Sequence, residues 1–235
     1  MTHPSAGDTA PAQAPDGPAV AGELLTTAFA YDGGRQVTVY VPAEPPQAVV
    51  YAGDGELIAG WGGALEAAGT VPTLIVGVHR TSDPDEMVRI QEYSPSFDPQ
   101  RFTAHERFFV EEVRAWVDGR FGPGLPPERT AVCGVSAGAE LALALGLRHP
   151  TLYGAVFASS PGGGFRPPAA WPHLLPRVYL TAGTSEPFFL ENAQRWADAL
   201  AAVGAEVVLT ERDGDHGDPF WQAEFPRMVA WAFPS

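Results

Sequence analysis

The 235-residue chain is expected to form an α/β fold, with a mostly parallel central sheet and helices on both faces. Two observations predict this fold. First, the chain contains short apolar runs that are typical of strands covered on both faces. Second, these runs alternate with longer amphipathic stretches that are typical of helices. Such alternation builds strand–helix–strand units whose strands are parallel. With 45% hydrophobic residues the chain can bury a large core, and we expect one domain over residues 23–235.

The expected elements begin with residues 35–41, which alternate polar and apolar side chains as a half-buried edge strand does. Residues 48–52 and 73–78 are continuous apolar runs and are expected to be buried strands, with a helix over 57–68 between them. A long loop follows the second run. Residues 102–121 then repeat large apolar side chains at helical spacing, which predicts an amphipathic helix.

In the second half of the chain, strands and helices continue to alternate. The apolar run 130–133 is expected to be a strand, followed by a helix that His149-Pro150 ends. Three further strands are expected over 154–159, 177–182 and 206–210, with helices over 188–203 and 219–233.

Residues 1–22 are rich in Ala, Pro, Gly and Thr and show no apolar period, so we expect a disordered N-terminal tail. The tail lacks the basic segment and apolar core of a signal peptide, and no apolar run approaches the roughly 20 residues of a membrane helix. The only cysteine, Cys133, has no partner for an internal disulfide and is expected to be buried. A cytoplasmic location is therefore expected.

The net charge of −14 disfavours nucleic acid and anionic membranes as partners, because both would be repelled. We expect a small-molecule substrate instead and no metal ion or cofactor. The sequence leaves the oligomeric state open.

Ser136 lies in Gly-Val-Ser-Ala-Gly (134–138), directly between an expected strand and an expected helix. In this context the pattern predicts a nucleophile elbow, the sharp turn that presents the reactive serine of a serine hydrolase. The two glycines leave room where the turn passes close to neighbouring backbone. The alternative is a structural serine in a tight turn.

A nucleophilic serine needs a histidine base and usually a carboxylate that orients it, in the chain order Ser, acid, His. Of the six histidines only His216 follows the last expected strand, although an ordinary loop histidine is the alternative. Glu186 follows the strand over 177–182 and is the preferred acid, but the same position suits the start of a helix at Pro187. Poorer choices for the acid are Asp213, Asp215, Glu191 and Asp198.

An oxyanion hole needs two backbone N–H groups. The residue after the nucleophile, Ala137, is expected to supply one of them. The second is expected from the glycine-containing loop 53–56, for which an ordinary Asp-Gly turn is the alternative.

With these residues assembled, the chain resembles the esterase family of the α/β-hydrolases that holds enterochelin (enterobactin) esterases, esterase D-like enzymes and mycolyltransferases. The resemblance implies an α/β-hydrolase fold, with Ser136 as nucleophile, His216 as base and Glu186 as acid. No insertion in the chain is long enough for a separate cap domain, so none is expected. The resemblance further implies Glu56 and Ala137 as oxyanion donors, with Arg89 and Trp221 at the substrate. The chain departs from the larger enterochelin esterases, which carry a separate N-terminal domain, and has Gly-Asp-His where Gly-Gly-His is commoner. The motifs that carry the resemblance are 54–56, 89–93, 134–138, 183–188 and 213–221.

The cleft is expected to be open, with walls formed by residues 81–101 and 161–176. Arg80, Arg89 and Arg166 are expected on its side, which would suit an anionic ligand such as an iron–siderophore complex, although Arg89 could equally pair with Glu92. We therefore expect a serine esterase acting on a siderophore or other natural-product ester. The alternatives are an acyltransferase with the same machinery and a non-catalytic binding module of the same fold.

Overall fold

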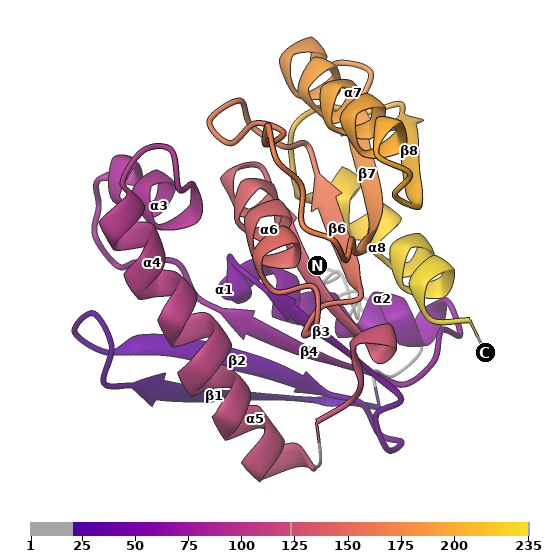
Figure 1. The fold of residues 1–235 in the computed structure, drawn as a ribbon. Coiled ribbons are helices and arrows are strands. Elements are labelled where there is room, and N and C mark those ends of the chain that lie inside the picture. Colours follow the sequence, from indigo (N-terminus) through magenta and orange to yellow (C-terminus); the bar gives the residue numbers. More distant parts are fainter. Residues whose placement is uncertain (1–20, 123, 235) are drawn as a thin grey trace, which may run out of the picture.

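The computed structural model describes residues 21–122 and 124–234. Within this part of the chain, eight strands form one sheet in the order β1-β2-β4-β3-β5-β6-β7-β8, with helices on both faces (Figure 1). Strands β3 to β8 are parallel to one another, and β2 is antiparallel to both of its neighbours, β1 and β4. The predicted mostly parallel α/β fold is confirmed. The predicted tail lies outside the described residues except for Ala21 and Gly22.

All seven predicted strands are present, but the edge of the sheet is not where the sequence placed it. Residues 35–41 form β2, which is covered on its outer side by an additional strand, β1, over its whole length. The segment that forms β1 alternates only weakly and stays largely exposed, so its sequence carries little strand signal. The strands are β1 (Glu23–Phe29), β2 (Arg35–Val41), β3 (Ala48–Ala52), β4 (Thr73–Val78), β5 (Thr130–Val135), β6 (Ala155–Ser159), β7 (Arg177–Gly183) and β8 (Val207–Arg212).

The helices differ from the expectation in three places. The first expected helix is divided into α1 and α2 by a 3₁₀ turn, and the long amphipathic helix begins earlier and contains a π-helical turn at Phe108–Val113. A helix, α3, occupies the expected long loop, where the Asp85 carboxylate accepts a hydrogen bond from the Met87 N–H and so caps its start. The helices are α1 (Gly55–Ile58), α2 (Gly62–Ala67), α3 (Glu86–Tyr93), α4 (Pro99–Arg107), α5 (Arg114–Phe121), α6 (Ala137–Arg148), α7 (Pro187–Ala202) and α8 (Asp218–Ala232).

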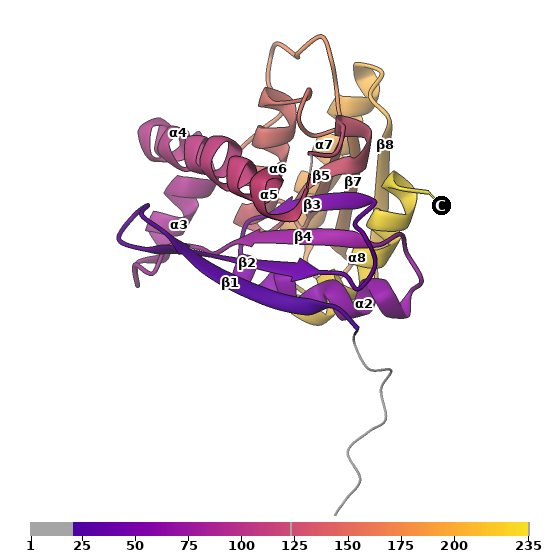
Figure 2. The ribbon, with the colours of Figure 1, turned by 90° about the horizontal axis from the view of Figure 1, so that it is seen from below.

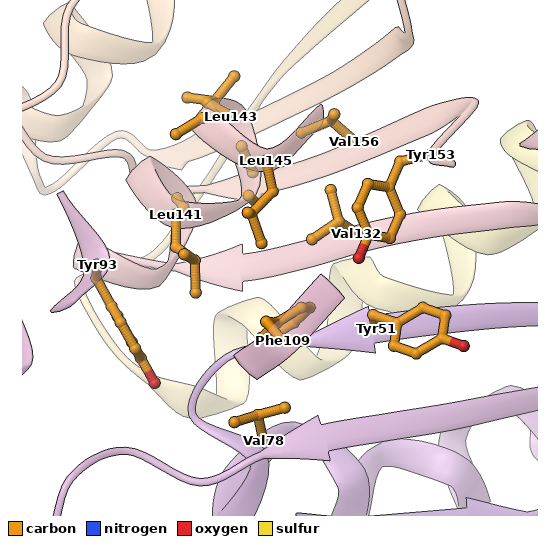
Figure 3. Packing of buried hydrophobic residues seen from close by; sticks show 14 of the residues in the cluster. Tyr51, Val78, Tyr93, Phe109, Val132, Leu141, Leu143, Leu145, Tyr153 and Val156 are labelled. Carbon is orange, nitrogen blue, oxygen red and sulfur yellow. The ribbon is translucent and has the colours of Figure 1, made fainter. Parts of the chain in front are cut away.

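Two hydrophobic clusters hold the layers together, one on each face of the sheet. One face is covered by α3 to α7, and the opposite face by α1, α2 and α8 (Figure 2). Figure 3 shows the first cluster, with Leu141 and Leu145 of α6 lying over Val132 of β5. Cys133 points into the second cluster and is buried, as predicted. No helix among the described residues is long and apolar enough to cross a membrane.

The parallel strands end at one edge of the sheet, and ligands of such sheets bind at the carboxyl ends of the strands. The connections that follow β3, β5, β7 and β8 carry the predicted oxyanion loop, nucleophile, acid and base. The topology therefore gathers the predicted site at this edge.

Candidate active site

Ser136 forms the turn between β5 and α6 and has φ 56° and ψ −122°. A positive φ is uncommon for a residue with a side chain and marks a strained turn. The Ser136 N–H donates a hydrogen bond to the Ser159 carbonyl at 2.9 Å, which fixes the turn against β6. A Cβ atom at Gly134 would lie 1.8 Å from the Gly138 carbonyl oxygen, so only glycine fits there. This is the strand–turn–helix geometry that the motif requires.

The two expected oxyanion donors lie at the starts of two helices. Ala137 is the first residue of α6 and Glu56 the second residue of α1. The first N–H groups of a helix have no partner within it and carry the positive end of its dipole, so both groups suit an anion. The Asp54 carboxylate, directly before α1, lies 2.8 Å from the position that a Cβ of Gly138 would take. The structure thus places the two helix starts next to each other.

Arg89 holds the loop before α1 in place. Its Nε and Nη2 donate to Oδ1 and Oδ2 of Asp54 at 2.8 and 2.7 Å, a bidentate ion pair between α3 and the loop. Burial raises the pKa of the Asp54 carboxyl, and the Arg89 guanidinium opposes that rise. The Asp54 N–H donates to the Tyr93 hydroxyl at 2.9 Å. Arg89, expected at the substrate, is thus engaged with the protein, and its other expected partner, Glu92, pairs with Arg35 instead.

Glu186 and His216 are in direct contact. Glu186 Oε2 lies 2.6 Å from His216 Nδ1, and the carboxylate side chain is almost fully buried. Asp215 accepts a hydrogen bond from the backbone N–H of His216, and Asp213 lies near Thr184. Of the carboxylates weighed as the acid, the structure places Glu186 on the imidazole.

The His216 ring is also held by two aromatic side chains. Phe189 stacks on its face with ring centroids 3.9 Å apart, and Trp221 meets it edge-on at 4.7 Å. Because an ionised carboxylate only accepts hydrogen bonds, His216 Nδ1 carries a proton and donates the hydrogen bond to Glu186 Oε2. In the neutral ring, Nε2 then carries the lone pair, which is the arrangement that a general base needs.

Hydrogen bonds tie Ser136, Glu186 and His216 to neighbouring strand ends. Ser136 binds the backbone of Ser159, the next residue Ser160 donates to Glu186, and Glu186 binds His216. The three predicted residues therefore belong to adjoining strand ends.

The two segments expected as cleft walls meet. A Cβ at Gly164 would lie 2.3 Å from the Phe97 ring, so this glycine allows the loop after β6 to pack against the segment after α3. Glu140 of α6 accepts hydrogen bonds from the N–H groups of Gly164 and Phe165 at 2.9 and 2.8 Å. Phe165 and Trp171, which lie in the loop, pack against the core residue Trp196.

Of the three arginines expected on the side of the cleft, two form ion pairs. Arg80 is half exposed and pairs with Glu56 at 3.2 Å and with Glu86 at 3.1 Å, while Arg89 pairs with Asp54. Arg80, Arg89 and Glu56 line a polar cavity of about 530 Å³ beside α1. Arg166 is exposed. The carboxylates of Glu56, Glu86 and Asp54 thus offset the positive charge of Arg80 and Arg89.

A family model described as "Putative esterase" matches residues 30–232. The chain belongs to this esterase family. The resemblance drawn from the motifs is confirmed, and so is the α/β-hydrolase type of fold. A rice protein (Oryza sativa subsp. japonica) named "Probable carboxylesterase" is 36% identical over 99 residues, which span 36% of this chain and 37% of the rice protein.

Solved structures show how widely the fold of this family member is shared. A ferulic acid esterase matches with a TM-score of 0.69 and 16% identity over 90% of this chain and 97% of its own. The Shigella flexneri enterobactin esterase matches with a TM-score of 0.71 and 18% identity, and here 94% of this chain covers 60% of that protein. An S-formylglutathione hydrolase from Agrobacterium tumefaciens matches with a TM-score of 0.67 and 15% identity over 92% of this chain and 96% of its own.

Three features of the candidate site were not expected from the sequence: Ser160, Phe189 and the contacts of Trp221. Trp221 was expected at the substrate, but it is buried and its Nε1–H donates to Ser160 Oγ at 2.9 Å. The available signal for Ser160 was its position directly after β6, at the edge where the site lies. Among the residues that the structure describes, no group of three or more His, Cys, Asp or Glu side chains is placed to hold a metal ion.

Proposed function

We propose that this member of the esterase family is a serine esterase that hydrolyses carboxylic esters through an acyl-enzyme on Ser136. The observation that carries the proposal is the contact of 2.6 Å between the buried Glu186 carboxylate and His216, at the same edge of the sheet as the strained turn at Ser136. A serine hydroxyl is a weak nucleophile at its ordinary pKa and needs an oriented base of this kind.

In the proposed reaction, Ser136 Oγ attacks the ester carbonyl carbon while His216 Nε2 takes the hydroxyl proton. The backbone N–H groups of Ala137 and Glu56 hold the negative oxygen that forms. His216 then returns the proton to the leaving alcohol, which departs as the acyl-enzyme forms. Water attacks the acyl-enzyme by the same steps, releasing the acid and restoring Ser136.

The roles of Glu186 and the aromatic side chains follow from this cycle. His216 becomes an imidazolium in each step, and the Glu186 carboxylate on Nδ1 stabilises that positive charge. Phe189 and Trp221 hold the plane of the ring, so that little reorientation is needed when the proton moves.

As the substrate we propose a siderophore or another natural-product ester in the cytoplasm. Similarity of fold to the enterobactin esterase supports the first choice. Because Arg80 and Arg89 are ion-paired, we expect an iron-free trilactone siderophore to be cleaved faster than its anionic iron complex.

The test measures hydrolysis of a short p-nitrophenyl ester by wild type, Ser136→Ala and His216→Ala, with Thr151→Ala and His149→Gln, beyond the opposite end of α6 from Ser136, as controls. We expect both site variants to lose activity by at least about 1,000-fold and the controls to keep it. Activity that survives in either site variant contradicts the proposal. Trilactone siderophores, free and iron-loaded, are then assayed with product identification by mass, and a transferred acyl group in place of free acid would indicate an acyltransferase.

A further inference from the structure

We propose that Ser160 and Trp221 are positioning residues that jointly set the orientation of the Glu186 carboxylate toward His216. The inference rests on the proposed function, in which Glu186 acts through His216. It assigns Trp221 a role at the acid in place of the substrate contact expected from the sequence. The observations that carry it are a directed chain of hydrogen bonds, its burial and its backbone geometry.

The direction of the chain is fixed by chemistry. An indole N–H can only donate, so Ser160 Oγ accepts from Trp221 Nε1 at 2.9 Å. The Ser160 hydroxyl hydrogen is then left to donate to Glu186 Oε1, at 2.5 Å. Trp221 thus selects the hydroxyl orientation in which Ser160 is a donor to the carboxylate.

The two oxygens of Glu186 are thereby given different partners. Oε1 receives the Ser160 hydroxyl and the Gly183 N–H, the latter at 2.6 Å. Oε2 faces His216 Nδ1. A carboxylate with two donors on one oxygen cannot rotate without losing them, so the other oxygen is held toward the imidazole.

Burial makes these bonds hard to replace. Ser160, Glu186 and Trp221 are 0%, 4% and 7% exposed. Water therefore has little access to the carboxylate, and removing the Ser160 hydroxyl would leave the indole N–H without its acceptor.

Ser160 also adopts a backbone conformation that costs energy. Its φ is 49°, in the left-handed region that residues with a Cβ rarely occupy, and its N–H is tied to the Thr181 carbonyl of β7 at 2.8 Å. The turn places the Ser160 hydroxyl between β7, which leads to Glu186, and α8, which carries Trp221. Since Trp221 also meets the His216 ring edge-on, one side chain contacts both the base and the support of the acid.

The test compares Ser160→Ala, Trp221→Phe and the double variant with wild type, with Trp231→Phe on the same helix as the matched control. Trp221→Phe removes the N–H but keeps an aromatic ring beside His216. Each single variant is expected to lower kcat about 10- to 100-fold with KM within twofold. Ser160→Ala removes the charge-assisted hydrogen bond to Glu186, and Trp221→Phe removes the donor that orients the Ser160 hydroxyl for this bond. The double variant is expected to be no slower than the slower single variant, because both residues act through one bond chain.

A second readout does not depend on turnover. The Nδ1 proton in a short histidine–carboxylate hydrogen bond gives a far-downfield proton NMR signal. We expect this signal in wild type, in Ser136→Ala and in Trp231→Phe, and its loss or shift in Ser160→Ala. If hydrolysis fails in wild type while the signal behaves as expected, the proposed function is wrong and the positioning role stands.

Ser160→Gly provides a variant that accepts φ 49° without strain, so a folding defect of Ser160→Ala does not obscure the result. Unchanged kcat and an unchanged NMR signal in Ser160→Gly overturn the proposal. So do losses in the two single variants that multiply in the double, since they would show independent roles. A raised KM with unchanged kcat in Trp221→Phe would show that Trp221 contacts the substrate and would contradict a positioning role.

Discussion

Replacing Arg89 with methionine tests whether this arginine supports the oxyanion loop or contacts the substrate. The Arg89 and Asp54 side chains are 14% and 7% exposed, and two hydrogen bonds of 2.8 and 2.7 Å join them. Removing one member of such a pair leaves the other as an unpaired buried charge, at a cost of about 3–5 kcal/mol in unfolding free energy. Methionine keeps most of the volume, so this cost reports the charge and not a cavity.

The double variant Asp54→Asn/Arg89→Met removes both charges, so it separates the cost of an unpaired buried charge from the loss of the ion pair itself. Asparagine tolerates the positive φ of 49° at position 54 and carries no charge. The double variant is expected to recover at least half of the stability that Arg89→Met loses. Activity is expected to fall about 10- to 100-fold in Arg89→Met, mainly in kcat, because the Glu56 N–H that follows Asp54 is displaced from the developing oxyanion.

The measurements are urea unfolding followed by fluorescence and the hydrolysis kinetics of a p-nitrophenyl ester. Arg107→Met is the control, because Arg107 is 73% exposed and its ion pair with Glu111 contributes less than about 1 kcal/mol. A loss of less than about 1 kcal/mol in unfolding free energy in Arg89→Met, together with a raised KM and unchanged kcat, would refute the structural role and indicate that Arg89 contacts the substrate.

The remaining predictions concern the elbow, the loop after β6 and a buried histidine. Gly134→Ala is expected to abolish ester hydrolysis, because its Cβ would collide with the Gly138 backbone. Gly119→Ala in α5 is the control and is expected to keep activity, because no atom of the described residues beyond its chain neighbours and helix backbone lies within 4 Å of the added Cβ. Equal activity of the two variants would contradict the elbow geometry. Glu140→Gln keeps one oxygen that can accept from the N–H groups of Gly164 and Phe165, whereas Glu140→Ala keeps none. We therefore expect Glu140→Ala to lower kcat/KM at least tenfold more than Glu140→Gln. Equal kinetics of the two variants would show that Glu140 does not hold the loop after β6 in place. Burial lowers the pKa of His105 to about 3, so its neutral form stabilises the fold above the unfolded pKa of about 6.5 and this stability is lost as the pH falls. Between pH 7.5 and pH 5, urea unfolding of wild type is expected to lose about 2 kcal/mol more than that of His105→Gln, and parallel losses would contradict a neutral His105.

The sequence predicted the strands well where continuous apolar runs were clear, as in β3 and β4. It missed β1, whose exposed segment alternates weakly, and α3, whose start depends on one capping carboxylate at Asp85. Periodicity reports which side chains are buried, so an element with little burial leaves a weak pattern.

The candidate site shows the same division between local and distant information. Ser136 was identifiable because its motif is contiguous, and His216 and Glu186 because chain order and strand ends limit the choice. Arg89 was assigned to the substrate or to Glu92 at helical spacing, yet its partner is Asp54, 35 positions away. Ser160 and Trp221 are 61 positions apart, and their contact follows from the packing of α8 against β6, which no local pattern encodes.

The identity of the nucleophile can be measured directly by labelling the protein with a fluorophosphonate and locating the modified residue by mass spectrometry. Ser136 as nucleophile predicts one label on the peptide that contains Ser136, much slower labelling of His216→Ala, and no label in Ser136→Ala. Labelling at another residue, or unchanged labelling of Ser136→Ala, would contradict catalysis by this serine.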